Sequence, residues 1–460
     1  MKTAETVEGR EALSRQLTSA QLAMIAIGGA IGTGLFLGSA LAVRVAGPGV
    51  IVSYLIGAAI ALLFMGALSE MAVAHPTAGS FGVYAELYLN PWAGFAVRYT
   101  YWAAQCIAIG SEATAIAIYC QWWFPNTPKW VWVLAFSVAL VYVNARSVAN
   151  FGAFEYWFAM IKVVAIVAFV VLGVALVFGF GPAPAVGFRN FTAHGGFLAT
   201  GWRGVWMAMV FVIFSYLGTE VVAVTAGEAK DPEVAVPRAM RSMVARLILF
   251  YLGSMIVLIS IVPWNQIQPG ADVTASPFVK VFRLIGIPAA AHVVNFVVIT
   301  AAASSMNCNL YLCSRMIFSL ACGGYAPAMF GRVSSRGVPL AALLASAAGL
   351  AVATVTAFVY PDSAYVYLFG ISLFGGLFAW LVIFVTHFYF RRKWRGARLA
   401  VRMAGYPYTT IVGALSIAAI LATTWFVEGM RVTLIAGVPW LLAITIAYLA
   451  VRRRRAEQAN

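Results

Sequence analysis

Two short stretches place glycines or polar residues inside long apolar runs of this 460-residue sequence. The first is IGGAIGTGLF at positions 27–36, where four of ten residues are glycine. The second is FSYLGTE at 214–220, which brings Ser215, Thr219 and the charge of Glu220 among bulky apolar side chains. Each glycine costs a helix about 1 kcal/mol relative to alanine, and a charge near the centre of a membrane helix costs at least about 2.5 kcal/mol. Both stretches therefore predict interrupted helices.

An interrupted helix at membrane depth exposes peptide groups, which survive there only around a protein-walled cavity. The free N–H groups and the dipole at the start of a half-helix attract a carboxylate, while exposed carbonyl groups accept from an ammonium group. A zwitterionic amino acid carries both charges. Packing through small residues is the alternative, but four clustered glycines are more than packing needs. We expect one ligand site, with candidate residues Gly29, Ala30, Ile31, Gly32, Thr33, Gly34, Phe214, Ser215, Leu217, Gly218 and Glu220.

A charged residue inside an apolar run needs a reason for its position, and we single out Lys162, Glu220 and Glu112. Lys162 lies within the run at 153–180, where an amine can release its proton when it is desolvated, so we interpret it as a proton-coupling residue. A lysine that snorkels to the interface is the alternative. Glu220 is expected to tune the site, relay protons or brace the unwound backbone, and Glu112 is expected to contact the ligand or a polar network. Neutral polar residues are expected to line the cavity or to bond between helices: Gln105, Asn307 and Asn309.

Cysteine and histidine positions predict no metal site, no cofactor and no disulfide framework. The five cysteines are scattered along apolar or span-end stretches, so we expect them to be buried small side chains. His75 and His292 lie near predicted loops without partners at metal-ligand spacing. The sequence also shows no nucleophile–base pair and no phosphate-binding loop. These observations speak against an enzyme.

The composition is that of a polytopic α-helical membrane protein. Hydrophobic residues make up 63% and charged residues 10% of the chain, whereas a soluble domain needs roughly 25% charge. The mean hydropathy is +0.90, and long continuous apolar runs speak against a transmembrane β-barrel. The net charge of +15 comes from loops between these runs, so we expect contact with anionic lipid head groups and not with nucleic acid.

Apolar runs of about 20 residues, enough to cross the hydrocarbon layer, predict twelve spans. They lie at 20–44, 49–73, 92–121, 130–146, 153–180, 204–228, 241–262, 285–318, 338–359, 363–390, 408–427 and 432–451. The stretch HPTAGSFGVYAELYLNP at 75–91 predicts an interfacial amphipathic helix.

Basic residues orient these spans, because cytoplasmic loops are enriched in lysine and arginine. Most of the 30 basic residues fall on one side if both termini are cytoplasmic, including the block RRKWRGARLAVR at 391–402 and the tail from Arg452 to Arg455. The polar segment at 1–19 has no apolar core, so no removable signal peptide is expected.

At these residues the chain resembles the amino acid–polyamine–cation (APC) superfamily of permeases, in its bacterial amino acid transporter branch. The motifs occur in order along nearly the whole chain: GGAIGTGLFLGSA, AGPGVIVSY, FEYWFAMIKV, GTEVVAVTAGEAKDPEVAVPRA and SRMIFSLACGGYAP. The resemblance implies a leucine-transporter-like fold. Two inverted repeats would lie at 20–180 and 204–390, followed by two extra helices at 408–451 and a basic tail at 452–460.

The resemblance also implies roles for particular residues. Thr33 and Gly34 would hold the substrate carboxylate, and the carbonyl groups of Ala30, Phe214 and Leu217 would hold its amino group. Phe214 would stand as an aromatic gate over the ligand. Lys162 would occupy the point where sodium-driven relatives hold an ion, although Ser304 and Ser305 are hydroxyls of the kind that ligate sodium.

The expected function is import of an α-amino acid across the bacterial inner membrane by proton symport and alternating access. The expected partners are the amino acid, a proton and membrane lipid. An amino acid/amine exchanger and a sodium-coupled symporter remain alternatives, and a non-transporting nutrient sensor is a further one. Neither the substrate side chain nor the oligomeric state follows from the sequence.

Overall fold

The structure is a computed structural model that describes residues 17–459 apart from 78, 147, 181–183, 229–231, 268–276, 285, 287–288, 360–363, 395–398 and 400. Most of the predicted tail at 1–19 and the residue Lys230 lie outside the described residues. The regular elements within them are helices. The first span is made of α2 (Ser19–Ala30), the π-helix η1 (Gly34–Gly38) and α3 (Ser39–Ala46). The sixth is made of α9 (Gly201–Met207), α10 (Met209–Tyr216) and α11 (Val221–Thr225).

The other predicted spans each contain one long helix. In chain order these are α4 (Val50–Ala74), α6 (Pro91–Cys120), α7 (Lys129–Arg146), α8 (Val148–Phe178), α12 (Pro232–Ile261), α14 (Ala290–Cys322), α15 (Leu340–Val359), α16 (Ala364–Lys393), α17 (Tyr408–Thr423) and α18 (Val432–Ala459). Two shorter helices, α5 (Ser80–Tyr88) and α13 (Pro277–Leu284), lie between them.

By length and composition, eight helical segments among the described residues can cross a membrane. The most apolar, at 150–178, has a mean hydropathy of 2.9. The protein is therefore a multi-pass membrane protein. The helix at 129–146 is not one of the eight, and α2 is too short to cross alone, so the count of twelve stays a prediction.

Two predicted boundaries differ clearly from the helices. The run at 241–262 lies in α12, which begins nine residues earlier at Pro232, a residue suited to the first turn of a helix. The run that ends at 451 lies in α18, which continues to Ala459 through four arginines. Arginine and glutamate are good helix formers, so helical winding continues past the apolar part that hydropathy detects.

The helix predicted at 75–91 exists as α5, and its position at the membrane interface stays a prediction. Most of α5 is buried against α6 and α16. Phe81 packs against the ring of Tyr101 with centroids 4.9 Å apart. Glu86 pairs with Arg98 of α6 at 2.5 Å. Tertiary packing therefore draws this helix into the bundle.

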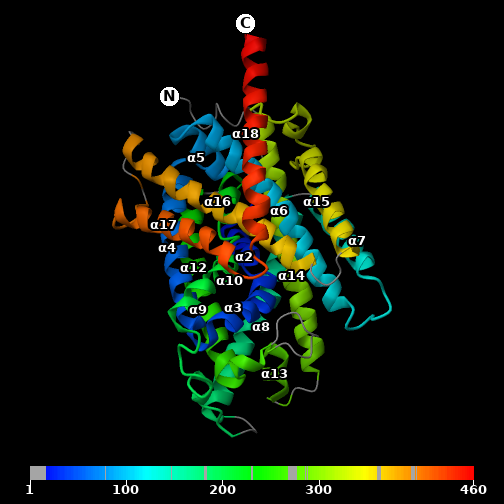
Figure 1. Ribbon diagram of the computed structural model, residues 1–460. Coiled ribbons are helices and arrows are strands. Elements are labelled where there is room, and N and C mark those ends of the chain that lie inside the picture. The colour runs from blue at the N-terminus through cyan, green and yellow to red at the C-terminus, as the bar shows by residue number, and fades with distance from the viewer. Residues whose placement is uncertain are drawn as a thin grey trace.

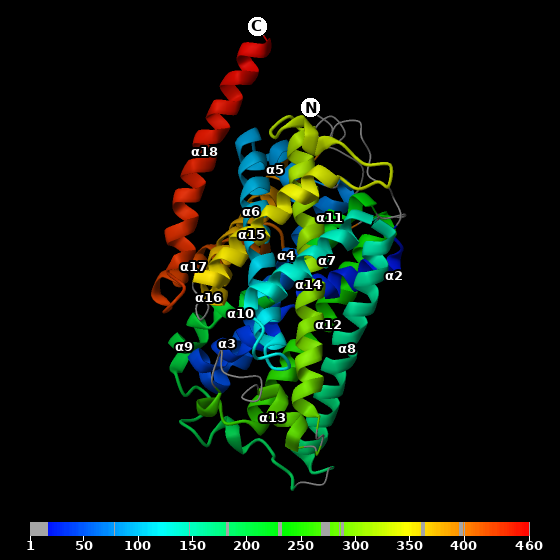
Figure 2. The same cartoon turned by 90° about the vertical axis from the view of Figure 1, so that its right-hand side faces the viewer.

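Helices α6 and α14 form the centre of the bundle, and the last two helices lie at its periphery. The most apolar window of α14 is 94% buried, whereas that of α18 is 17% buried. Figure 2 shows α17 and α18 on one side of the bundle and α8 on the other. In Figure 1 the end of α18 and α5 lie at one end of the molecule and α13 lies at the opposite end.

Candidate functional site

The first span is interrupted where its glycines predicted. Helix α2 ends at Ala30, and Ile31 has non-helical angles of φ −97° and ψ 90°. Gly32 and Thr33 separate it from η1, which starts at Gly34. The interruption leaves peptide groups of these residues without helical partners, as a broken membrane helix must.

The second interruption lies between α10 and α11. Leu217 is extended with ψ 150°, and Gly218 has φ +94°, a conformation that only glycine adopts readily. A β-carbon on Gly218 would lie 2.3 Å from the carbonyl oxygen of Gly29. The two broken segments therefore touch backbone to backbone, which explains a glycine on each side.

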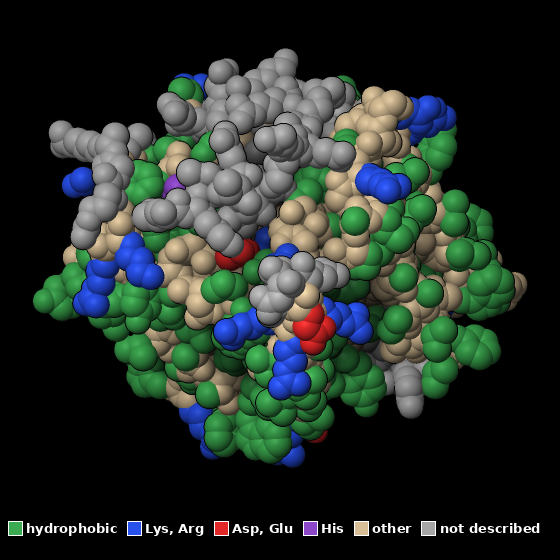
Figure 3. Space-filling view, turned by 90° about the horizontal axis from the view of Figure 1, so that it is seen from above, with side chains coloured by type: hydrophobic (Ala, Val, Ile, Leu, Met, Phe, Trp, Pro, Cys, Tyr) green, Lys and Arg blue, Asp and Glu red, His purple; other side chains and the backbone are tan. Residues whose placement is uncertain are grey.

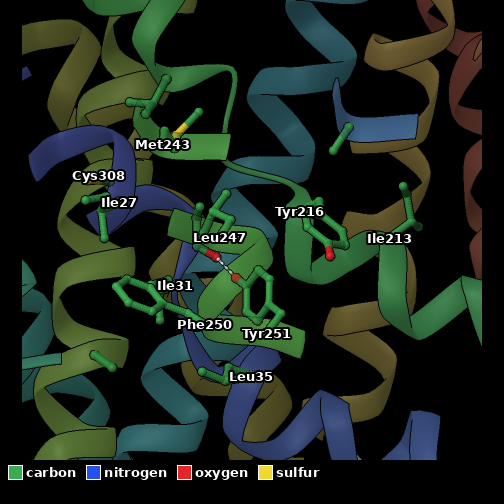
Figure 4. Close-up of a cluster of buried hydrophobic side chains, with 14 of the residues drawn as sticks. Ile27, Ile31, Leu35, Ile213, Tyr216, Met243, Leu247, Phe250, Tyr251 and Cys308 are labelled. Atoms are coloured by element: carbon green, nitrogen blue, oxygen red, sulfur yellow. Dashed lines mark hydrogen bonds between the residues drawn. The ribbon is translucent and has the colours of Figure 1, made fainter. Parts of the chain in front are cut away.

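One tyrosine of α12 ties both interruptions together. The hydroxyl of Tyr251 lies 2.9 Å from the Ala30 carbonyl oxygen and 2.6 Å from that of Ser215, and it donates to both. Figure 4 shows Tyr251 beside Leu247 and Phe250, facing Ile31 and other apolar side chains of the first span. The side chain of Ile31 thus belongs to the apolar core.

A carboxylate already occupies one N–H group of the first interruption. The backbone N–H of Thr33 donates to Glu112 at 3.3 and 3.5 Å, and the Ser305 hydroxyl donates to the same carboxylate at 3.0 Å. A β-carbon on Gly32 would lie 2.5 Å from Oε1 of Glu112. Glycine at position 32 therefore makes room for this carboxylate.

An ammonium group occupies two carbonyl groups of the same interruption. Nζ of the fully buried Lys162 donates to the carbonyl oxygens of Gly28 and Ile31, both at 2.7 Å. The buried Glu155 interacts electrostatically with this ammonium group. A β-carbon on Gly28 would lie 1.8 Å from Oε1 of Glu155. The alternative of a snorkelling lysine is wrong, because Lys162 points into the bundle.

The carboxylate of Glu220 accepts three hydrogen bonds. The Tyr101 hydroxyl donates at 2.8 Å, the Trp380 indole at 3.2 Å and the backbone N–H of Gly218 at 3.0 Å. Its geometry is that of a group that braces the second interruption against α6 and α16.

A cavity of about 40 Å³ lies where the two interruptions meet. It is large enough for two or three water molecules, since one needs about 10–15 Å³. Eight candidate residues line it: Gly29, Ala30, Gly32, Gly34, Glu112, Phe214, Leu217 and Gly218. Gln105 and Asn309, which were expected to line the cavity or to bond between helices, line it too, together with Ala108, Ser305, Ser372 and Gly376.

Five candidate residues do not line this cavity, each for a local reason. The hydroxyl of Thr33 lies 3.4 Å from that of Tyr365. The hydroxyl of Ser215 lies 3.5 Å from that of Tyr54. Asn307 donates to Glu155 at 3.1 Å and accepts from Asn144 at 2.7 Å. Ile31 and Glu220 have the partners given above.

Sequence reasoning missed Ala108, Ser372 and Gly376 of the cavity lining, and two residues that hold the interruptions in place, Glu155 and Tyr251. Glu155 lies seven residues before Lys162, which places both on one helix face two turns apart, so that spacing could have predicted it. Tyr251 lies in an ordinary apolar run and gives no such signal.

Comparison with known proteins agrees with this architecture. Residues 21–460 match the profile of the family described as amino acid permease. The chain is 39% identical to the gamma-aminobutyric acid permease of Bacillus subtilis (strain 168), over 98% of this chain and 96% of that protein. It is 38% identical to a probable threonine/serine transporter of the same organism, over 97% of each chain. It is also 38% identical to the aromatic amino acid transport protein AroP of Salmonella typhi, over 95% of this chain and 96% of that protein.

The fold is that of a multi-pass membrane protein with a small cavity between two interrupted helices, and the matched family and relatives are transporters, not enzymes. The chain belongs to the amino acid permease family, within the APC superfamily.

Proposed function

We propose that the protein imports an α-amino acid by proton symport, alternating access around its two interrupted spans. The observation that carries the proposal is the cavity at their junction, which brings N–H and carbonyl groups of both interruptions to one place. Helix ends of this kind hold charged substrates in transporters with discontinuous spans.

The substrate carboxylate would bind the N–H groups at Thr33 and Gly34. Glu112 supports this assignment, because its carboxylate accepts from the Thr33 N–H at 3.3 Å. The substrate and Glu112 would therefore compete for this position. The carbonyl groups of Ala30, Phe214 and Leu217 would accept from the substrate ammonium group.

The substrate side chain would lie against neutral polar groups from α6, α14 and α16. Gln105, Asn309 and Ser372 line that part of the cavity, together with the small residues Ala108 and Gly376. The cavity of about 40 Å³ has room for two or three water molecules, so it must widen to admit an α-amino acid with any side chain. A bulky side chain would require Phe214 to move.

Lys162 would couple substrate movement to a proton. Its ammonium group binds two carbonyl oxygens of the first interruption, as a metal cation would. Loss of its proton would leave an uncharged amine, whose two N–H groups hold these carbonyl oxygens more weakly, so that the interruption could rearrange. An ammonium group at this point repels a sodium ion, which favours proton over sodium coupling.

The proposed topology has twelve spans, with inverted repeats at 20–180 and 204–390 and two added helices at 408–451. Both termini would be cytoplasmic in a bacterial inner membrane. Exposed arginines at the end of α18 support this orientation. Figure 3 shows the Lys and Arg side chains around that end. At the same end of the molecule, the ammonium group of Lys393 donates to the carbonyl oxygen of Tyr88 at 2.7 Å.

Uptake into proteoliposomes tests the proposal. Labelled amino acids are offered with competition by all twenty, in vesicles with an inward proton gradient and no internal substrate. We expect accumulation that a protonophore abolishes and that does not need sodium. Accumulation only into vesicles preloaded with an amino acid or amine would show an exchanger, and accumulation only with sodium would show a sodium symporter.

A further inference from the structure

A wholly apolar groove runs along the outer face of α8, away from the candidate substrate cavity. It encloses about 530 Å³ between α8, α13 and α14, and Phe36 of η1 also lines it. Helix α8 contributes Trp157, Met160, Ile161, Val164, Ala165, Ile166, Ala168, Phe169 and Leu172. The remaining lining residues are Phe278, Phe282, Val293, Val294 and Val297.

The chemistry of the groove selects a hydrocarbon ligand. The indole of Trp157 is the one hydrogen-bonding side chain in its lining. Water does not occupy such a cavity, because it finds no polar partners there. The lining residues of α8 span positions 157 to 172, a rise of about 22 Å at 1.5 Å per residue. The groove is therefore long, narrow and dry.

The groove opens onto a surface that faces lipid. Trp157 is 67% exposed, Val164 59% and Val171 60%, all on α8. This helix has the highest mean hydropathy of the membrane-crossing segments, 2.9, and only 33% of its window is buried. Acyl chains are the solvent at such a surface.

The size of the groove matches a single acyl chain. An apolar cavity of about 150 Å³ holds benzene, with six carbons. By proportion, 530 Å³ holds about 20 carbons. A helix of a second copy, about 10–12 Å in diameter with its side chains, is too wide for this volume over 22 Å. We propose that the groove binds one acyl chain of a membrane phospholipid.

The bound chain would contact the outer half of the first interrupted span. The ring of Phe36 packs against Phe278 of α13 with centroids 5.1 Å apart, and Phe278 packs against Phe169 of α8 at 4.7 Å. Phe36 follows the cavity-lining Gly34 by two residues. The chain would therefore brace the first span against α8 and α13. Any effect of this bracing on transport rests on the proposed function, whereas lipid binding in the groove does not.

Lipid binding is measured by native mass spectrometry of the purified, delipidated chain titrated with palmitoyl-oleoyl phosphatidylglycerol. We expect the wild type to gain one tightly bound lipid. Ala168→Trp fills the groove and should weaken this binding at least tenfold. Val164→Asn places a polar group in the groove and should weaken it as well.

Val171→Asn is the matched control, because Val171 is as exposed as Val164 but does not line the groove. It should bind lipid like the wild type. Equal binding by all four proteins would overturn the proposal. A wild-type dimer that Ala168→Trp converts to a monomer would also overturn it, since the groove would then join two copies.

A second measurement separates this proposal from the transport mechanism. Wild-type uptake should change between vesicles of short-chain and long-chain phosphatidylglycerol, and Ala168→Trp should remove that difference. Lipid binding without any uptake would leave the groove assignment intact and contradict the proposed function instead.

Discussion

At the scale of single residues, the glycines of the first interruption make room for charged side chains of the protein itself. A β-carbon on Gly28 would meet Glu155, and one on Gly32 would meet Glu112. The sequence interpretation assigned these glycines to an interrupted helix at a ligand site. In the structure they make room for internal carboxylates, which bring charge to the unwound backbone.

Lys162→Ala removes the ammonium group from the Gly28 and Ile31 carbonyl oxygens. We expect loss of accumulation driven by a proton gradient, with substrate binding reduced no more than severalfold. Uptake and equilibrium binding are measured side by side in proteoliposomes. Arg203→Ala, at an exposed position, should behave as wild type. Full accumulation by the lysine variant would refute coupling through this side chain.

Glu155 and the Lys162 ammonium group are both buried and attract each other, so removing Lys162 leaves the Glu155 charge uncompensated, which is destabilising. The double variant Lys162→Ala with Glu155→Gln removes both charges. It should recover most of the lost thermal stability without recovering accumulation, which separates coupling from folding.

Gly32→Ala tests the space beside Glu112. The added β-carbon would lie 2.5 Å from the carboxylate oxygen and 2.8 Å from the Ser305 hydroxyl oxygen, so the unwound segment must shift and its Thr33 and Gly34 N–H groups would no longer be placed for the substrate. We expect the initial uptake rate to fall at least tenfold. Gly38→Ala is the matched control in the same span, because its β-carbon would meet nothing nearer than 4.0 Å. Similar rates for the two variants would contradict this account of the site.

At the scale of elements, the two interrupted spans depend on each other. Gly218 touches the Gly29 carbonyl, and Tyr251 binds carbonyl groups from both spans. A movement of one interruption is therefore transmitted to the other through backbone contact and one hydroxyl. Glu220 adds a third connection, from the second interruption to α6 and α16.

Gly218→Ala should destabilise the protein through two effects, a strained backbone conformation and a clash with Gly29. The left-handed conformation costs a non-glycine residue about 1–2 kcal/mol, and the clash with Gly29 adds to it. Gly429→Ala also forces a positive φ, of +77°, but its β-carbon would lie 3.5 Å from the nearest atom. The thermal midpoint of Gly218→Ala should lie below that of Gly429→Ala. Equal midpoints would show that the two spans do not press on each other.

Tyr251→Phe tests the shared hydroxyl without removing the ring. The Ala30 and Ser215 carbonyl groups lose a buried donor, which costs about 1–3 kcal/mol. We expect slower uptake and weaker substrate binding, measured on protein of verified thermal stability. Tyr408→Phe, at an exposed position, is the matched control. Unchanged uptake in Tyr251→Phe would show that the hydroxyl does not position the two spans.

At the scale of the whole molecule, charge and packing divide the bundle into two ends. Arg452 to Arg454 are exposed where α18 extends beyond the bundle, and α13 lies at the opposite end (Figure 1). The outer helices α17 and α18 leave large apolar side chains exposed, such as Leu415 and Leu442. Such surfaces suit hydrocarbon, and the charged end of α18 suits an aqueous, anionic interface.

The orientation is tested by labelling single cysteines in intact cells with a membrane-impermeant maleimide. In a background without native cysteines, Ala193→Cys should react from outside and Arg454→Cys should react only after the membrane is opened. The reverse pattern would place both termini outside and overturn the proposed topology.

The apolar segments and the two interruptions could be predicted from the amino-acid sequence alone. Lipid cannot hydrogen-bond peptide groups, so a span must be long and apolar, and clustered glycines or a charge at its middle mark a break. These are local properties, readable from residues 27–36 and 214–220 without knowledge of any neighbour. Membership of the amino acid permease family also followed from motifs along the chain.

Which side chains meet at the two interruptions could not be predicted, because it depends on how the helices pack. Asn307 and Asn309 lie two residues apart on α14, about 200° around the helix. Asn309 lines the cavity, whereas Asn307 binds Glu155 and Asn144. Tyr251 binds both interruptions from a different span. It lies 221 residues from Ala30 and 36 residues from Ser215 in the sequence. Helix rotation and packing fix such contacts, and no property of a short stretch encodes them.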